Sequence, residues 1–224
     1  MRSAHLGLAL AVMALLATTG CKLVDNNPGA KDPAFAKIDG EFLKTGGDGD
    51  DWAFPGQSYG EARHSPLTKI NDKNVSELGI AWFADMPDAR GHESTPVEVD
   101  GRLFVTGPWS KVFAFEAKTG KPLWQFDPEV DKSRGVKACC DVVNRGVAVW
   151  KGKIFVGTID GRLIALDAKT GEEIWSAQTL DPKSNGIITG FPRVVKDLVI
   201  IGNGGAEFGA RGYVTAYHAD TGKQ

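Results

Sequence analysis

The sequence has little excess of either charge, few sulfur-containing side chains and no apolar run long enough to cross a membrane. Its 26 Lys and Arg against 28 Asp and Glu leave a formal net charge of −2, without the basic surplus that binding to a phosphate backbone requires. Nucleic acid is therefore not an expected partner. The apolar run Leu6–Ala17 is shorter than the about 20 residues of a membrane-spanning helix. No Cys-x-x-Cys-His motif occurs, which excludes c-type haem attachment to this segment.

The N-terminus has the pattern of an export signal. Arg2 precedes the apolar run Leu6–Ala17, and small residues follow it up to Cys21. We predict that residues 1–20 are a secretory signal and that the mature chain is periplasmic. The small residues before Cys21 resemble a bacterial lipoprotein signal, in which this cysteine is lipidated and provides membrane anchoring. Ordinary cleavage that removes Cys21 is the alternative.

Residues 21–50 are predicted to be a tether and N-terminal segment. Lys22–Asp32 is polar and holds an Asn-Asn-Pro-Gly turn, a composition typical of flexible linkers. The acidic stretch Asp48–Asp51 lacks the glutamate of a calcium loop, because Tyr59 occupies the twelfth position. We interpret it as a solvated turn.

Glycine is abundant, at 28 of 224 residues, and it marks an internal repeat. Thr-Gly turns recur at Gly120, Gly171 and Gly222, with a spacing of 51 residues each time. Trp124 and Trp175 share that spacing. A period near 50 residues is typical of repeat architectures such as propellers.

The repeat predicts short antiparallel strands rather than helices. Arg102–Val105 and Lys153–Val156 are equivalent predicted strands, and Leu78–Trp82 is predicted as a strand of an atypical first unit. Turn residues recur at short intervals, and no long amphipathic helix lies between them. The fold class is therefore all-β, with antiparallel four-stranded blades over residues 51–224 and tryptophan packed between neighbouring sheets. The third copy carries a six-residue insertion within Asn203–Arg211, and such insertions often hold binding sites.

Two segments, together with the repeat, resemble those of a known family. Cys139-Cys140-Asp-Val-Val-Asn-Arg145-Gly and the Gly-Ala-Glu of the insertion resemble the quinoprotein alcohol dehydrogenases that use pyrroloquinoline quinone. The resemblance covers about Asp51–Gln224. It implies the N-terminal part of an eight-bladed β-propeller that oxidises a small alcohol to an aldehyde and passes electrons to cytochrome c or another acceptor.

The resemblance also implies a cofactor-binding set. Cys139 and Cys140 would form a vicinal disulfide that covers one face of the quinone, although a reduced, buried pair is the alternative from the residues alone. Arg145 would pair with a cofactor carboxylate, unless it forms a surface salt bridge. The remaining implied cofactor-binding residues are Glu93, Thr189, Gly204, Gly205 and Ala206.

The implied metal ligand is Glu207, which would bind Ca²⁺; a lanthanide in its place is the alternative. Taken alone, Glu207 is a glutamate in a glycine-rich turn. Phe191 stands where the family usually has alanine, so it either crowds the pocket or repacks it. The family's catalytic aspartate and second metal ligand have no match in this chain, so we expect the isolated chain to be inactive.

A second class of function shares part of the pattern. A noncatalytic propeller lipoprotein that scaffolds outer-membrane assembly would also have the export signal and the Thr-Gly/Trp repeat. Such a scaffold has no reason to keep Cys139-Cys140 or the insertion with Glu207. The sequence therefore favours the enzyme.

Overall fold

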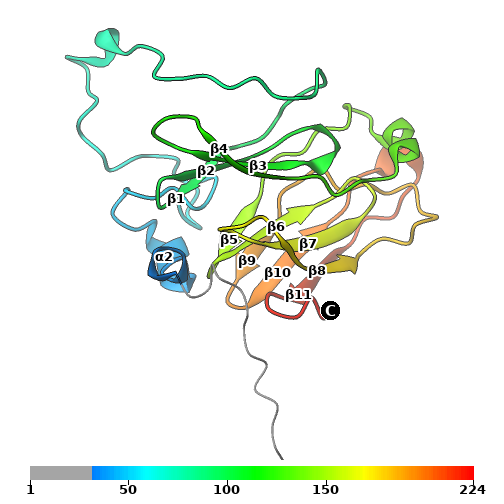
Figure 1. Ribbon diagram of the computed structural model, residues 1–224. Coiled ribbons are helices and arrows are strands. Elements are labelled where there is room, and N and C mark those ends of the chain that lie inside the picture. The colour runs from blue at the N-terminus through cyan, green and yellow to red at the C-terminus, as the bar shows by residue number, and fades with distance from the viewer. Residues whose placement is uncertain (1–31) are drawn as a thin grey trace, which may run out of the picture.

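The computed structural model describes residues 32–224 as three antiparallel sheets packed side by side (Figure 1). The predicted signal, Cys21 and most of the predicted tether lie outside the described residues. The first sheet consists of β1 (Val97–Val99), β2 (Arg102–Thr106), β3 (Val112–Glu116) and β4 (Pro122–Phe126). The middle sheet consists of β5 (Ala148–Trp150), β6 (Lys153–Gly157), β7 (Arg162–Asp167) and β8 (Glu173–Gln178). The third consists of β9 (Arg193–Val195), β10 (Leu198–Gly202) and β11 (Val214–His218).

Within each sheet, consecutive strands along the chain pair with one another, so each sheet is an antiparallel meander. Equivalent residues of the sequence repeat pair in the same way in two sheets: Ala114 lies opposite Trp124 in the first sheet, and Ala165 lies opposite Trp175 in the middle sheet. The register shifts directly after the alanine in both sheets. The predicted all-β fold with four-stranded antiparallel units is confirmed.

A tryptophan of the first sheet and one of the middle sheet each dock on the glycine turn of the next sheet along the chain. The indole Nε1 of Trp124 donates to the Ala168 carbonyl at 3.3 Å, and a Cβ on Gly171 would come within 2.6 Å of its ring. The close packing therefore needs glycine at this turn. The same contact recurs for Trp175 with Ala219 and Gly222, and for Trp82 with Ala117 and Gly120.

The predicted strand Leu78–Trp82 is wrong, because this segment is irregular in the structure. Ile80 is 87% exposed and nearby Phe83 is 81% exposed. Within residues 32–224 no strand pairs with the segment, so its backbone gains no ladder of hydrogen bonds. Trp82 nevertheless makes the same docking contact as the later tryptophans.

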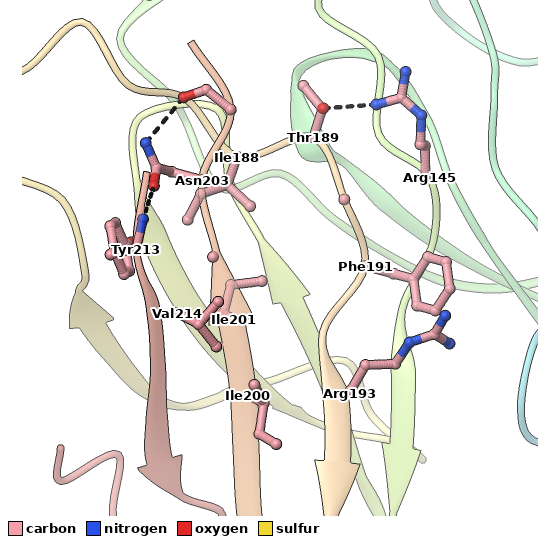
Figure 2. A pocket seen from close by; sticks show the side chains of 13 residues that line it. Arg145, Ile188, Thr189, Phe191, Arg193, Ile200, Ile201, Asn203, Tyr213 and Val214 are labelled. Atoms are coloured by element: carbon pink, nitrogen blue, oxygen red, sulfur yellow. Dashed lines mark hydrogen bonds between the residues drawn. The ribbon is translucent and has the colours of Figure 1, made fainter. Parts of the chain in front are cut away.

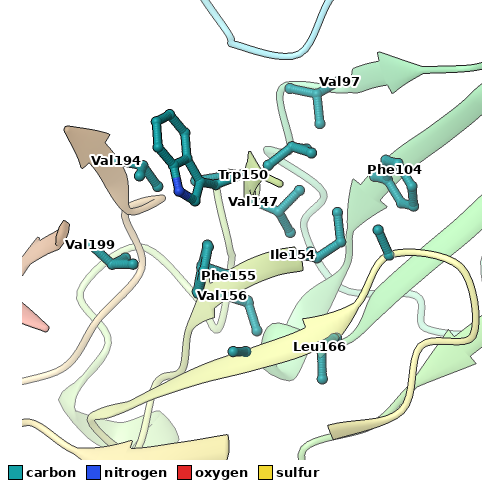
Figure 3. Close-up of a cluster of buried hydrophobic side chains, with 14 of the residues drawn as sticks. Val97, Phe104, Val147, Trp150, Ile154, Phe155, Val156, Leu166, Val194 and Val199 are labelled. Carbon is teal, nitrogen blue, oxygen red and sulfur yellow. The ribbon is translucent and has the colours of Figure 1, made fainter. Parts of the chain in front are cut away.

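The hydrophobic core lies between the sheets, where side chains from all three meet (Figure 3). Phe104 of β2, Phe155 of β6 and Val199 of β10 are completely buried. Every residue of β5 and β6 is buried, whereas β10 alternates between buried and partly exposed positions. The middle sheet, apart from its outer strand β8, is therefore covered on both faces. It forms a rigid scaffold, since burial of one such side chain contributes about 1.5–3 kcal/mol.

Two short helices occupy part of the predicted N-terminal segment: α1 (Pro33–Ala36) and α2 (Gly40–Thr45). They begin at aspartate side chains that accept backbone N–H groups, which is a favourable N-cap. Phe35 and Leu43 are buried in the main core. None of the helices in residues 32–224 has the length and apolar character that a membrane crossing requires.

The interpretation of Asp48–Asp51 as a solvated turn is wrong for its last residue. Asp51 is only 4% exposed, accepts the Asp100 N–H at 2.8 Å and forms an ion pair with Lys37. Asp48 and Asp50 are exposed. Asp51 is buried because it joins the N-terminal segment to the turn that follows β1.

We expect Gly171→Ala to destabilise the protein more than Gly101→Ala. Both glycines have positive φ, +76° and +70°, so both variants lose about 1–2 kcal/mol to backbone strain. Only Gly171 lies against a tryptophan ring, since a Cβ on Gly101 would meet nothing within 4 Å. Overpacking adds about 1–3 kcal/mol to the loss. Urea unfolding measures the difference, and equal losses would contradict the docking role.

Candidate functional site

Arg145 is at the centre of the candidate site. Its Nη1 donates to Oγ1 of Thr189 at 2.6 Å (Figure 2). Its Nη2 lies 2.8 Å from Oε2 of Glu93. Their backbones are also joined, because Arg145 N–H donates to the Thr189 carbonyl at 2.9 Å and Thr95 N–H donates to the Arg145 carbonyl at 3.1 Å. Three of the predicted cofactor-binding residues therefore converge from three separate segments.

Asn144 anchors this arrangement on the middle sheet. Its side-chain amide donates to the Gly157 carbonyl at 2.8 Å, and its Oδ1 accepts the Gly146 N–H at 3.1 Å. Its own carbonyl accepts the Thr106 hydroxyl at 3.0 Å. Asn144 is buried, and a buried amide stabilises a fold only when its polar atoms are paired. No sequence motif marks Asn144, and its place beside Arg145 is the signal that could have found it.

A cavity of about 460 Å³ opens beside Arg145 and Thr189 (Figure 2). Gly204 lies on its wall, together with Phe191 and Arg193. The Arg193 guanidinium lies 4.1 Å from the Phe191 ring centroid and 4.7 Å from the Phe54 ring centroid. Phe191 therefore lines the cavity, the place that the resemblance gave it, and it packs on Arg193. No sequence motif marked Arg193.

Cys139 and Cys140 are exposed free thiols in the structure, with their Sγ atoms 2.7 Å apart. The predicted disulfide between them stays a prediction. The Cys139 thiol hydrogen-bonds Cys140 and donates to the Glu207 carboxylate, and these contacts raise the pKa of Cys139 to about 12. The Glu207 backbone N–H and the Cys139 thiol lower the pKa of Glu207. The predicted metal ligand thus lies, ionised, beside the cysteine pair.

Glu207 lies on a short 3₁₀ helix, η5 (Ala206–Phe208), with a left-handed glycine at each end. The Asn203 side chain closes the loop: its Oδ1 accepts the Tyr213 N–H at 3.0 Å and its Nδ2 donates to the Arg211 carbonyl at 3.2 Å. The predicted insertion is therefore a closed loop that presents Glu207. In residues 32–224 no group of three or more His, Cys, Asp or Glu side chains is arranged to hold a metal ion.

Asp141 connects the cysteine pair to the segment that carries Glu93. Its carboxylate forms an ion pair with Arg90 and accepts the Gly91 N–H at 3.3 Å. Asp141 has a left-handed backbone with φ 69°, a conformation that costs energy in a non-glycine residue. The hydrogen bond from Arg90 is the main reason that the pKa of Asp141 falls to about 2. No sequence motif predicts this link.

The comparison with protein families decides the identity of the fold. Residues 52–224 match the model of the PQQ family, described as "Glucose/ethanol/alcohol dehydrogenase, beta-propeller domain". The chain belongs to the PQQ-dependent alcohol dehydrogenase family. The predicted resemblance and the propeller fold are thereby confirmed.

Individual members of the family are similar over most of the chain. Quinohemoprotein alcohol dehydrogenase ADH-IIG of Pseudomonas putida is 50% identical over 221 residues, which are 97% of this chain and 29% of that protein. The solved structure of ADHIIG from Pseudomonas putida HK5 superposes with a TM-score of 0.83 at 52% identity, over 86% of this chain and 28% of the other. The chain thus spans less than a third of the length of these relatives, at their N-terminal part.

Two further relatives differ in what their names state. The 1-butanol dehydrogenase (cytochrome c) of Thauera butanivorans is 54% identical over 170 residues, which are 75% of this chain and 25% of that protein. A europium-containing methanol dehydrogenase structure has a TM-score of 0.77 at 41% identity, over 82% of this chain and 32% of the other.

We expect the Asp141 carboxyl to titrate at about pH 2, well below its ordinary pKa of 3.8. Because the folded-state pKa is lowered, the link to Arg90 stabilises the fold above the ordinary pKa. The stabilisation is lost as the pH falls through the folded value. Carboxyl ¹³C NMR measures the midpoint, and Arg90→Met should raise it. A midpoint near 3.8 in the unaltered protein would contradict the ion pair.

Proposed function

We propose that this chain is the part of a periplasmic, PQQ- and Ca²⁺-dependent alcohol dehydrogenase that supplies one cofactor face and one metal ligand. The observation that carries the proposal is the convergence of Arg145, Glu93 and Thr189 beside a cavity of about 460 Å³. The scaffold alternative gives no role to this convergence, and the matched family consists of dehydrogenases.

The residues present fit a flat cofactor that carries carboxylates. The Arg145 side chain is 40% exposed, so its planar fork of donors is accessible, and such a fork binds a carboxylate with two charge-assisted hydrogen bonds. Thr189 adds a hydroxyl. Gly204 on the cavity wall carries no side chain, so its backbone can approach a ring closely. We assign Gly205 and Ala206 to the same lining by their place in the insertion.

Glu207 fits the role of a metal ligand. Its carboxylate is exposed and its pKa is lowered, and Ca²⁺ binds carboxylate oxygens. A lanthanide is the alternative metal, since one relative is named for europium. Because no described cluster of acidic, histidine or cysteine side chains completes the site, its other ligands come from elsewhere. Held by these residues, a bound quinone would supply the hydride acceptor for alcohol oxidation, and a bound metal ion would supply a Lewis acid.

The cysteine pair would close the same site from one side. Cys139 contacts Glu207, so the pair lies where a rigid lid over a metal-bound cofactor would lie. We propose that Cys139 and Cys140 form a vicinal disulfide in the oxidising periplasm. Thiol labelling tests this: the pair should react only after reduction, and labelling without reductant would contradict the disulfide.

The remaining parts of the proposal concern the whole enzyme. The catalytic base is supplied outside this chain, so the isolated 224 residues do not turn over alcohol. The electron acceptor is cytochrome c or a similar carrier, as the name of the butanol dehydrogenase relative states for that protein. The signal in residues 1–20 directs export, and lipid on Cys21 anchors the protein to the membrane.

Reconstitution of the full-length protein with PQQ and Ca²⁺ tests the proposal. Dye reduction with primary alcohols should appear in the unaltered protein and be absent in the isolated 224-residue chain. Glu207→Ala should abolish the calcium-dependent activity, because it removes a metal ligand. Glu172→Ala, at an exposed glutamate in the Thr-Gly turn of the middle sheet, is the matched control and should keep it.

Two results would contradict the proposal. An unaltered protein that neither retains quinone absorbance nor oxidises alcohols would overturn the assigned activity. Unchanged activity of Glu207→Ala across a Ca²⁺ titration would exclude Glu207 as the ligand.

A further inference from the structure

Arg134 is a buried arginine that none of the roles above uses. It lies on the 3₁₀ helix η4 (Lys132–Lys137), which leads directly to the cysteine pair. Its side chain is only 5% exposed. In residues 32–224 it forms no ion pair, although a buried charge is costly unless polar groups compensate for it.

The compensation comes from one loop. Nη1 of Arg134 donates to the carbonyls of Pro182 and Ser184, each at 2.9 Å, and Nη2 donates to the Gly186 carbonyl. The Lys137 ammonium donates to the same Ser184 carbonyl at 3.0 Å. The guanidinium therefore gathers three carbonyls of residues 182–186 around one planar group. An ammonium group has no such fixed fork of donors.

The same loop packs against the insertion that carries Glu207. The Asn185 side chain donates to the Phe208 carbonyl at 2.9 Å, and a Cβ on Gly205 would come within 2.8 Å of the Asn185 carbonyl. Directly after the loop, Ile187 and Gly204 exchange backbone hydrogen bonds of 2.9 and 3.3 Å. Residues 182–187 thus connect Arg134 to both sides of η5.

The helix that bears Arg134 is itself fixed. Gly135 lies against the Trp109 ring, where a Cβ would come within 3.0 Å. Trp109 N–H donates to the Val142 carbonyl at 2.9 Å, close after the cysteine pair. Short contacts therefore hold both the cysteine segment, next to Arg134, and the insertion that carries Glu207.

We propose that Arg134 is a positioning residue that holds the Glu207 carboxylate against the cysteine pair by clamping residues 182–186. The clamp is a property of this chain without any ligand. Only its consequence, a well-placed metal ligand, rests on the proposed function. Polar groups around a metal ligand commonly set metal affinity in this way, and their loss lowers it about 10- to 100-fold.

Arg134→Met tests the clamp, because methionine keeps much of the apolar side chain and removes all the donors. Hydrogen–deuterium exchange of the metal-free full-length protein should become faster in residues 182–187 and 203–212. Ca²⁺ titration of the quinone-loaded protein should show half-saturation at a concentration about 10- to 100-fold higher. Arg134→Lys should show a smaller increase in exchange and a smaller rise in Ca²⁺ half-saturation than Arg134→Met, since it keeps the charge and one donor position.

Two control variants make the result specific. Arg102→Met removes a partly buried arginine that pairs with Asp100 and lies over Phe35, away from Glu207, and should change neither readout. Lys137→Met removes one donor to the Ser184 carbonyl and should give a smaller change in the same segments. If Arg134→Met does not fold, Arg134→Lys and Lys137→Met decide the question by the same two measurements.

The outcomes separate the clamp from the proposed function. Faster exchange confined to residues 182–187 and 203–212 supports the clamp, even if the unaltered protein binds no Ca²⁺ and the proposed function fails. Exchange that is unchanged there, or that rises equally across the middle sheet, overturns the clamp. Unchanged Ca²⁺ half-saturation in Arg134→Met, with Ca²⁺ binding intact in the unaltered protein, overturns its role in placing the metal ligand.

Discussion

The docking of a tryptophan on the glycine turn of the next sheet is the contact on which the rest of the structure depends. Trp124 and Trp175 each donate a hydrogen bond to a backbone carbonyl of the next sheet's turn. Each ring also packs against a glycine of that turn, where no side chain would fit. The contact buries a large aromatic surface and pairs its polar atom at the same time. Because it repeats, the angle and spacing between neighbouring sheets repeat as well.

That fixed spacing determines where the connecting segments meet. The segment before β5 carries Arg145 and the segment before β9 carries Thr189, and the two are joined by both backbone and side-chain hydrogen bonds. Glu207 comes from a third segment and reaches the cysteine pair. The candidate site brings together residues far apart in the sequence because these segments lie at strand ends of neighbouring sheets. The antiparallel pairing of β9 with β10 places the start of β9 beside the end of β10. The site's support comes from β5 and β6 of the middle sheet, in which every residue is buried.

The sequence repeat predicted the strands well, since Arg102–Val105 and Lys153–Val156 each fall short of the observed strand by one residue. It failed at Leu78–Trp82, where the residues favour a strand but no neighbour pairs with them among residues 32–224. Glu93, Arg145 and Thr189 came from the family resemblance, and the structure brings them together. No sequence pattern marks the residues that hold the site in place. They bind backbone carbonyls or form ion pairs with residues that are distant in the sequence and become neighbours only in the folded chain. These residues are Arg134, Asp141 and Asn144.

The central claim is that Arg145 holds a carboxylated quinone at the junction of these segments. The most direct measurement is a titration of the full-length protein with PQQ, followed by absorbance, in unaltered, Arg145→Met and Arg102→Met forms. Loss of a charge-assisted pair should raise the dissociation constant of Arg145→Met about 10- to 100-fold, since such bonds contribute about 1.5–3 kcal/mol. Arg102→Met should bind the quinone as the unaltered protein does. An Arg145→Met protein with unchanged quinone affinity would contradict the account.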